Sequence, residues 1–502
     1  MSLAIAHTRA HYGLNAPRVT VEVHISSGLP KFMMVGLPET VVKESKDRVR
    51  SAIQNSGFEF PLGHITVNLA PAELPKMGSH FDLAMAVGIL AASQQIPADP
   101  LAHYELLGEL ALTGELRPVK GALPAMIQAT KEKKSLIVSH AHAGEAQELG
   151  EQAAIFCAHS LSDVCQHWVM NKPLPKASES VFSTVNTIEE TLIEALDFSQ
   201  VQGQAGAKRV LEIAASGGHS VLMVGSPGTG KSMLAERLPS ILPPPTPAER
   251  LETAAIYSFT EETPPKSYRP FRRPHHLASA VAVIGGGQPL RPGEISLAHH
   301  GVLFLDELPE FNRQVLEGLR EPLEAGAITI ARAKQTLTFP ARFQWIAAMN
   351  PCPCGYADDP LRVCRCTPDS IQRYQRKLSG PLLDRIDLYV PVQRRKKTLL
   401  SKSIESETSA GIRQRVIEAY ERQWARQGSQ NARLSYTPQS DLLKFSTALK
   451  TWIEDMFEQL KLSMRAQWRC LKVARTIADL ADSPTIEKEH ALEALSYRIR
   501  EP

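Results

Sequence analysis

The sequence has 502 residues, of which 43% are hydrophobic and 22% charged, and a formal net charge of +3, which is ordinary for a soluble globular protein of about two to four domains. No apolar run is long enough to span a bilayer, the N-terminus lacks a signal-peptide core and the seven cysteines are odd in number, so we expect a cytoplasmic protein with no membrane partner and no disulfide framework. The small net charge does not by itself indicate a nucleic-acid partner.

Residues 1–170 predict one α/β domain. Alternating apolar residues at 19–25 and 65–69 predict half-buried strands, and the charged, amphipathic stretch 40–56 predicts a helix that ends at Gly57. Two later segments, LAPAELPKMGSHFDLAMAVGIL and LLGELALTGELRPVKGAL, resemble the Lon-protease-like domain that also occurs in the bacterial repair protein RadA.

In the protease, this domain carries a catalytic Ser-Lys dyad. The present chain departs from that pattern at both positions. His80 stands near the serine position, with Ser79 one residue earlier, and Leu123-Pro124 stands where the lysine is expected. A serine without a basic partner is a poor nucleophile. A displaced pair of Ser79 and Lys120 stays open as an alternative, but we favour a non-proteolytic domain used for assembly or DNA contact.

Residues 171–190 lose apolar periodicity and predict a linker, and residues 191–395 predict an ATPase core. A short apolar run, 221–224, leads into a glycine-rich turn and then a helix, which is the P-loop pattern. Backbone N–H groups of such a turn bind phosphates, the lysine reaches the β- and γ-phosphates, and the following hydroxyl binds Mg²⁺. The predicted nucleotide-binding residues are Gly225, Ser226, Pro227, Gly228, Thr229, Gly230, Lys231 and Ser232.

A second apolar strand, 302–305, ends in two carboxylates. We expect Asp306 to hold Mg²⁺ through water and Glu307 to act as general base for the attacking water. A third strand, 343–349, ends in the polar Asn350, which we expect at the same edge of the sheet. The three strand ends together predict an ATPase that uses ATP and Mg²⁺.

Two insertions interrupt this core. The connection 271–301 contains two histidine pairs, His275-His276 and His299-His300, for which we favour hydrogen-bonding roles over metal binding. Residues 326–343 predict a β-hairpin with a basic tip. The residues predicted to contact DNA are Gly286 and Arg291 in the first insertion and Arg332 and Lys334 in the hairpin.

Four cysteines follow Asn350 within fifteen residues, as two C-x-C pairs. This grouping indicates a tetrathiolate Zn²⁺ site or a metal-stabilised loop, although C-x-C is tighter than the usual spacing and buried free cysteines remain the alternative. The candidate ligands are Cys352, Cys354, Cys364 and Cys366.

The stretch 362–397 is the most basic in the chain, with ten Lys or Arg and three Asp or Glu residues. Residues 396–410 predict a second linker. Helical periodicity then continues through 411–502, with helices expected at 412–426, 438–447, 450–460, 465–481 and 485–498, so this region predicts an all-α lid.

The order of these parts resembles the helix-2-insert, pre-sensor-hairpin branch of AAA+ ATPases, and within it the magnesium-chelatase-like proteins of the YifB/ComM type, over essentially the whole chain. The shared motifs include NPCPCGY and the later CRC. The resemblance places Val201 against the adenine and makes Asn350 the sensor-1 group. It also makes Arg385 an arginine finger that acts on a neighbouring subunit and Arg465 the sensor-2 arginine of the lid.

A finger that acts in trans implies a ring, expected to be a homo-hexamer. The resemblance implies a helicase that moves on single-stranded and branched DNA and promotes branch migration when incoming DNA is recombined during natural transformation, with recombination proteins as further partners. A chelatase-type motor that remodels a partner protein and an ATP-driven regulatory adaptor are the alternatives, since fold does not fix function.

Overall fold

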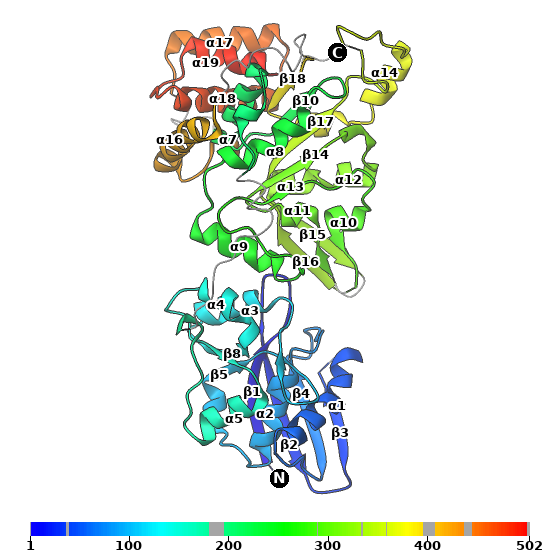
Figure 1. The fold of residues 1–502 in the computed structure, drawn as a ribbon, viewed down its shortest axis with the longest axis vertical. Helices are drawn as coiled ribbons and strands as arrows, with labels where there is room; N and C mark the ends of the chain where they lie inside the picture. Colours follow the sequence, from blue (N-terminus) through cyan, green and yellow to red (C-terminus); the bar gives the residue numbers. More distant parts are fainter. Residues whose placement is uncertain are drawn as a thin grey trace. The chain divides into compact units, whose positions relative to one another are not determined.

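The computed structural model describes residues 2–36, 40–179, 195–288, 290–332, 335–357, 359–394, 407–435 and 444–498 (Figure 1). The chain forms an N-terminal unit, Met1–Val185 with Leu251–Thr263, and a motor unit, Asn186–Arg250 with Pro264–Pro502. The sequence assigned residues 251–263 to the ATPase core, but the structure groups them with the N-terminal unit. The first part of the expected linker 171–190 packs on the N-terminal unit, since the Cys157 N–H donates to the Pro175 carbonyl at 3.0 Å and Ala177 is buried, so a linker that starts at residue 171 is corrected. Residues 180–190 and most of 396–410 lie outside the described residues, so the rest of both linkers stays a prediction.

The N-terminal unit is built on a mixed seven-stranded sheet in the order β3-β4-β2-β1-β5-β8-β9. Its alternating strands place Val19, Val21 and Val23 in the core, as the period of two predicts. The strands of this sheet are β1 (Ser2–Arg9), β2 (Arg18–Ser26), β3 (Lys31–Val35), β4 (His64–Ala70), β5 (Tyr104–Leu106), β8 (Ser135–Ser139) and β9 (Ile155–Ala158). The predicted strands 19–25 and 65–69 are therefore confirmed as β2 and β4.

Helices and a small ribbon complete this unit. They are α1 (Thr40–Asn55), α2 (Asp82–Ala92), α3 (Ala122–Lys131), α4 (Ala143–Gln147), α5 (Leu161–Val169) and the strands β6 (Glu109–Leu110) and β7 (Leu116–Arg117). Every residue of α2 is buried. The second half of α9 (Pro247–Tyr257) also belongs here: Ala254 and Ala255 share a core cluster with Leu123, and the Gly121 N–H donates to the Ser258 carbonyl at 2.8 Å.

The two members of the displaced Ser-Lys pair that the sequence left open each contact a different partner. The Ser79 hydroxyl donates to the Glu109 carboxylate, whereas Lys120 Nζ pairs with Glu261 Oε1 at 2.8 Å. His80 is 1% exposed and stacks on His11, with ring centroids 3.8 Å apart. Burial lowers the pKa of His80, so the ring stays neutral at pH 7. These contacts favour the non-proteolytic interpretation of the domain.

The motor unit contains a five-stranded sheet in the order β11-β14-β17-β10-β18, and all neighbouring strands are parallel. Its strands are β10 (Val221–Val224), β11 (Phe271–Arg272), β14 (Val302–Leu305), β17 (Gln344–Met349) and β18 (Leu388–Pro391). β14 and β17 are buried along their whole length, as expected for parallel strands covered on both faces. The carboxyl ends of these strands meet at one edge, which is where open α/β sheets bind ligands.

Helices and two ribbons surround this sheet. They are α7 (Ala205–Gly217), α8 (Lys231–Ile241), α10 (Ala280–Ile284), α11 (Glu294–Leu297), α12 (Arg313–Gly318), α13 (Arg320–Ala325), α14 (Pro368–Gln375) and α15 (Gly380–Leu383), with the ribbons β12 (Gly285–Gly286)–β13 (Arg291–Pro292) and β15 (Ala327–Arg332)–β16 (Gln335–Pro340). The antiparallel pairing of Ala327–Arg332 with Gln335–Pro340 confirms the predicted hairpin.

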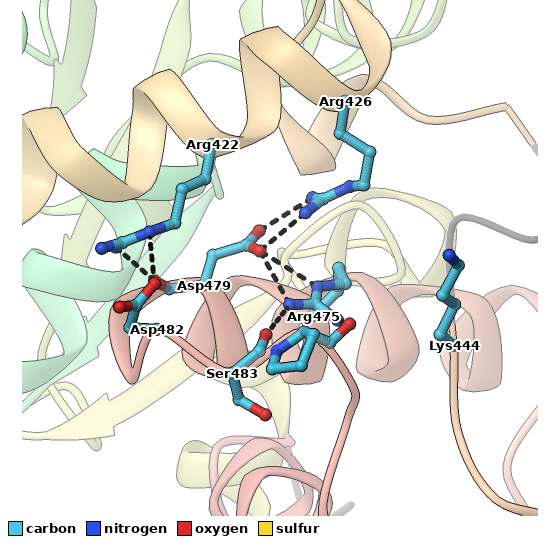
Figure 2. A pocket seen from close by; sticks show the side chains of 8 residues that line it. Arg422, Arg426, Lys444, Arg475, Asp479, Asp482 and Ser483 are labelled. Atoms are coloured by element: carbon cyan, nitrogen blue, oxygen red, sulfur yellow. Dashed lines mark hydrogen bonds and ion pairs between the residues drawn. The ribbon is translucent and has the colours of Figure 1, made fainter.

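The lid is helical, as predicted, with α16 (Ser409–Gln427), α17 (Thr447–Gln459), α18 (Met464–Leu480) and α19 (Lys488–Ser496). The helix expected at 438–447 lies mostly outside the described residues, and 444–446 are not helical. An ion pair between Arg426 of α16 and Asp479 of α18 ties these two helices together, and Asp479, which is 1% exposed, also binds Arg475 of its own helix (Figure 2). Among the described residues, none of the helices combines the length and apolar character needed to cross a bilayer.

Candidate ATP site and associated surfaces

The predicted P-loop joins the carboxyl end of β10 to the first turn of α8. Gly228 and Gly230 have φ values of 75° and 93°, which favour glycine, and a Cβ at either position would meet nothing within 4 Å. Gly225 has no such space, because a Cβ there would lie 2.2 Å from the Val392 carbonyl oxygen of the chain that follows β18. The turn is therefore closed towards the sheet and open on the side where a phosphate would lie.

Lys231 is 8% exposed and folds back over this turn. Its ammonium donates to the carbonyl oxygens of Gly225 and Ser226 at 2.6 and 3.1 Å and to Asn350 Oδ1 at 3.2 Å. Burial lowers the pKa of Lys231, while the nearby Asp306 and Glu307 carboxylates oppose that shift. The structure thus brings together the lysine and the polar end of β17, as their positions at one sheet edge predicted.

The carboxylates follow β14 directly. Ser232 Oγ donates to Asp306 Oδ2 at 2.6 Å, so the two predicted Mg²⁺-binding groups are in contact. Glu307 adopts the left-handed conformation, with φ 54° and ψ 47°, and its side chain is 51% exposed. An exposed carboxylate beside the phosphate-binding turn is available to a water molecule on the same side.

Two residues of the loop after β11 contact these carboxylates: Arg273, which was not singled out from the sequence, and His276, for which the sequence gave only a general hydrogen-bonding role. Arg273 donates to Asp306 Oδ2 at 2.9 Å and also pairs with Glu236 of α8. His276 Nδ1 lies 3.1 Å from Glu307 Oε2. The motif FRRPHH was visible, but no spacing rule connected it with a strand thirty residues later.

Other histidines of the pairs have hydrogen-bonding roles, as favoured from the sequence. His275 Nδ1 accepts the Leu277 N–H at 3.2 Å, and His299 Nδ1 accepts the Arg342 N–H at 3.0 Å.

The residues present fit a magnesium nucleotide. The open turn at Gly228 and Gly230, the buried lysine ammonium and the helix N-terminus of α8 form an anion site, and the contact between Ser232 and Asp306 offers two oxygen ligands for one cation. When bound, Mg²⁺ would neutralise charge on the transferred phosphoryl group. Val201, expected against the adenine, is 4% exposed in the motor core, and its contact with a base stays a prediction.

Arg385, the predicted finger, lies in the turn after α15. Its guanidinium pairs with Glu324 of α13 rather than with Asp384 or Asp387. Its carbonyl accepts hydrogen bonds from Ser220 Oγ at 2.7 Å and from Arg469 of α18 at 3.0 Å, so core and lid both fix this turn.

Arg465, the predicted sensor-2 residue, lies in the first turn of α18 with its side chain exposed. The action of both arginines on a nucleotide stays a prediction.

The four clustered cysteines converge, with all their sulfur atoms within 4.8 Å of one another. Cys352 Sγ lies 3.4 Å from Cys354 Sγ and 3.7 Å from Cys364 Sγ. Sulfurs bound to one Zn²⁺ at about 2.3 Å in a tetrahedron would lie about 3.8 Å apart, so the set fits that ion. Burial raises the pKa of Cys352 to about 12, whereas a backbone hydrogen bond at Arg365 lowers that of Cys354 to about 6.

The cysteine loop rests on the P-loop. Gly355, with φ 85°, leaves no room for a side chain, because a Cβ would lie 2.6 Å from Pro227 Cδ. Arg394 bridges the same two segments, since it donates to the Pro227 carbonyl at 3.1 Å and pairs with Asp359 at 3.2 Å. A change in the conformation of the cysteine loop, residues 352–366, would therefore displace Pro227 and with it the phosphate-binding turn.

The residues predicted to contact DNA are only partly described. Arg291 is exposed, but Gly286 is buried, so the exposed glycine of that turn is Gly287. Lys334 and the side chain of Arg332 lie outside the described residues. The prediction for Gly286 thus needs correction: the close backbone packing in this ribbon occurs at Gly285, where a Cβ would lie 2.5 Å from Ile330 Cδ1 of the hairpin.

The fold and the site define a P-loop ATPase of the AAA+ class, with a helical lid and a Lon-like N-terminal unit. Family models agree along the chain: Subunit ChlI of Mg-chelatase matches residues 21–142, Magnesium chelatase, subunit ChlI, matches 197–400, and its C-terminal model matches 406–498.

Curated relatives extend over nearly the full length. YifB of Salmonella typhimurium is 49% identical, covering 99% of this chain and 97% of its own, and Competence protein ComM of Haemophilus influenzae is 47% identical, covering 99% and 98%. An archaeal Lon protease of Thermococcus kodakarensis is 38% identical over 76 residues, or 15% of this chain and 11% of its own. The chain belongs to the magnesium-chelatase-like AAA+ family that includes YifB and ComM. Membership implies ATP hydrolysis with ATP and Mg²⁺.

Proposed function

We propose that this ATPase assembles as a homo-hexameric ring in the cytoplasm and uses ATP hydrolysis to move on single-stranded and branched DNA. Its role would be branch migration while incoming DNA is recombined in natural transformation. The similarity to a competence protein along the whole chain supports a role in natural transformation. The β15–β16 hairpin supports movement on DNA.

The observation that carries the proposal is the origin of the β15–β16 hairpin. It leaves the sheet between β14, which ends at Asp306, and β17, which ends at Asn350. The base of the hairpin lies at the amino end of β17, where the Ala341 N–H donates to the Gly326 carbonyl at 2.8 Å, and Asn350 follows the other end of the same strand. A shift of β17 on a change of phosphate contacts would therefore carry the hairpin with it. The exposed Arg291 on the neighbouring ribbon adds a cation of the kind that binds a nucleic-acid backbone.

Lys334→Ala is expected to weaken DNA binding for all sequences and to reduce the salt slope of binding by about one, because one phosphate contact is lost. ATP hydrolysis without DNA is expected to stay unchanged, while movement of a three-strand or four-way junction stops. Binding titrations across salt concentrations and a junction-migration assay measure these effects.

The matched control is Lys450→Ala, which removes an exposed lysine, 60% exposed, from lid helix α17. Equal DNA affinity and junction movement in the two variants would remove the hairpin from the mechanism. If DNA also fails to stimulate the wild-type ATPase, the chelatase-type reading, supported by the family models, takes its place.

We further propose that Cys352, Cys354, Cys364 and Cys366 hold one structural Zn²⁺ ion. Elemental analysis is expected to find about one zinc per chain. Replacing Cys364 and Cys366 with serine is expected to release the metal and to raise the KM for ATP, because the cysteine loop contacts Pro227 of the P-loop. Cys157→Ala, a change in the N-terminal unit, controls for loss of a thiol and is expected to keep the zinc. Protein purified without chelators that contains no zinc would contradict the assignment.

A further inference from the structure

The loop between the two cysteine pairs ends in an exposed apolar tip, residues 360–363. Leu361 is 61% exposed and Val363 is 88% exposed, and Val363 is the most exposed of the large apolar side chains described in the motor unit. Apolar surface in contact with water is unfavourable, and apolar side chains that are exposed together mark interaction sites. The tip therefore has the character of a contact surface.

The tip has a fixed shape. Cys354 and Cys364 stand at the two ends of the loop, and their sulfur atoms lie 3.6 Å apart. Inside the loop, Asp359 Oδ1 accepts the N–H groups of Leu361 and Arg362 at 2.8 and 3.2 Å. A surface that is already ordered loses little conformational freedom when it binds a ligand.

Arg362 stands between the two apolar residues and is placed by an aromatic ring. Its guanidinium lies over the ring of Tyr356, 5.1 Å from the centroid, and donates to the Tyr356 hydroxyl at 2.7 Å. The side chain is nevertheless exposed, so its other N–H donors are available to a phosphate or to a base.

The residues that follow the tip are strongly basic. The segment 360–377 contains five Lys or Arg residues and a single carboxylate, Asp369. The side chains of Arg365, Arg373 and Arg376 are exposed, and none of them has an ion-pair partner among the residues that the structure describes. Because Arg373 and Arg376 are three positions apart in and just after α14, they lie on the same side of that helix.

A nucleic-acid strand matches both properties of this surface. Its phosphates bind arginines, and its bases offer flat apolar faces against which leucine-type side chains pack or between which they insert. An acidic protein would satisfy the arginines but supplies no such regular alternation of charge and apolar faces.

We propose that residues 360–363 with Arg365, Arg373 and Arg376 form a second nucleic-acid contact surface of the motor unit, separate from the β15–β16 hairpin. The arginines bind phosphates, and Leu361 and Val363 pack against bases. The proposal rests on the proposed function for the presence of DNA, but it depends on residues that the hairpin mechanism does not use.

Two variants of the full-length protein separate the two kinds of contact. Leu361→Ser combined with Val363→Ser is expected to weaken binding of single-stranded DNA about tenfold with the salt slope unchanged, because base contacts are lost and phosphate contacts are kept. Arg365→Gln, Arg373→Gln and Arg376→Gln together are expected to reduce the salt slope by about two, since each contact with a single-strand phosphate contributes about 0.7. Binding titrations over a range of salt concentrations measure both quantities.

The matched control is Leu29→Ser combined with Leu62→Ser. These two side chains of the N-terminal unit are 88% and 90% exposed, so the control removes as much exposed apolar surface away from the tip, and wild-type binding is expected. Melting temperatures equal to that of the wild type are expected for all three variants, because every substituted side chain is exposed.

Wild-type affinity and salt slope in both tip variants, in a protein whose DNA binding Lys334→Ala weakens, would overturn this surface and leave the DNA motor standing. Weakened binding in the tip variants together with unchanged binding in Lys334→Ala would support the surface and remove the hairpin from the mechanism. A wild-type protein that binds neither single-stranded nor branched DNA would overturn both proposals.

Discussion

Replacing Glu307 with Gln is expected to lower the turnover of ATP by about a hundredfold or more, because a general base typically contributes that much. ATP affinity is expected to stay near wild type, since Lys231, the open turn and the contact between Ser232 and Asp306 are unchanged. Steady-state hydrolysis and equilibrium binding of a fluorescent nucleotide separate the two quantities.

Glu310→Gln is the matched control. Glu310 lies three residues later and pairs with Lys377 at 3.1 Å on the surface, so its loss is expected to leave turnover unchanged. Near-normal hydrolysis by Glu307→Gln would contradict the assignment of the base.

The same variant also tests Arg385. Mixing inactive Glu307→Gln subunits with Arg385→Ala subunits is expected to restore part of the activity if the finger acts across a subunit interface. Mixtures that stay inactive would place Arg385 in a structural role with Glu324.

The centre of the motor was predictable because its signals are local. An apolar strand followed by a glycine-rich turn identifies Lys231, and two further strands end at Asp306 and Asn350. Parallel strands place their carboxyl ends at one edge, so three separate strand ends predict one site. The contact of Lys231 with Asn350 at 3.2 Å confirms that inference.

The rest depended on contacts that no local pattern encodes. Arg273 and His276 reach the carboxylates from the loop that follows β11, and no spacing in the sequence links that loop to the end of β14. The sequence predicted a DNA contact at Gly286, yet Gly285 and Gly286 are buried, and Gly285 packs on Ile330 of the hairpin. Residues 251–263 belong to the N-terminal unit. The sequence could not predict this, because the pattern of an amphipathic helix shows that one face is buried but not which domain core buries it.

A buried charge cluster, also invisible in the sequence, joins the lid to the core. Asp387 is 5% exposed and accepts from Arg469 of α18 at 2.6 Å and from the Ser220 N–H at 3.1 Å. Burial alone would raise the pKa of Asp387, but the hydrogen bond with His219 and the charge of Arg469 together bring it below the ordinary value. The cluster also fixes the turn that carries Arg385, whose carbonyl binds Ser220 and Arg469.

Asp387→Asn is therefore expected to destabilise the motor unit by about 3 kcal/mol, because it removes one partner of a buried ion pair. For a unit of this size that loss lowers the melting temperature by about 5–10 °C, measurable by differential scanning fluorimetry or calorimetry. Asp384→Asn, which changes an exposed carboxylate in the same turn, is the control and is expected to melt like the wild type.

The lowered pKa of Asp387 also predicts how its contribution to stability changes with pH. A carboxylate whose pKa is lowered on folding stabilises the protein fully above its unfolded pKa of about 3.9, and this stabilisation is lost only as the pH falls below that value towards the folded pKa. The difference in melting temperature between wild type and Asp387→Asn is therefore expected to be equal at pH 8 and pH 6. A difference that shrinks between these two values would mean that Asp387 is protonated in the folded protein and that Arg469 holds the lid by another contact.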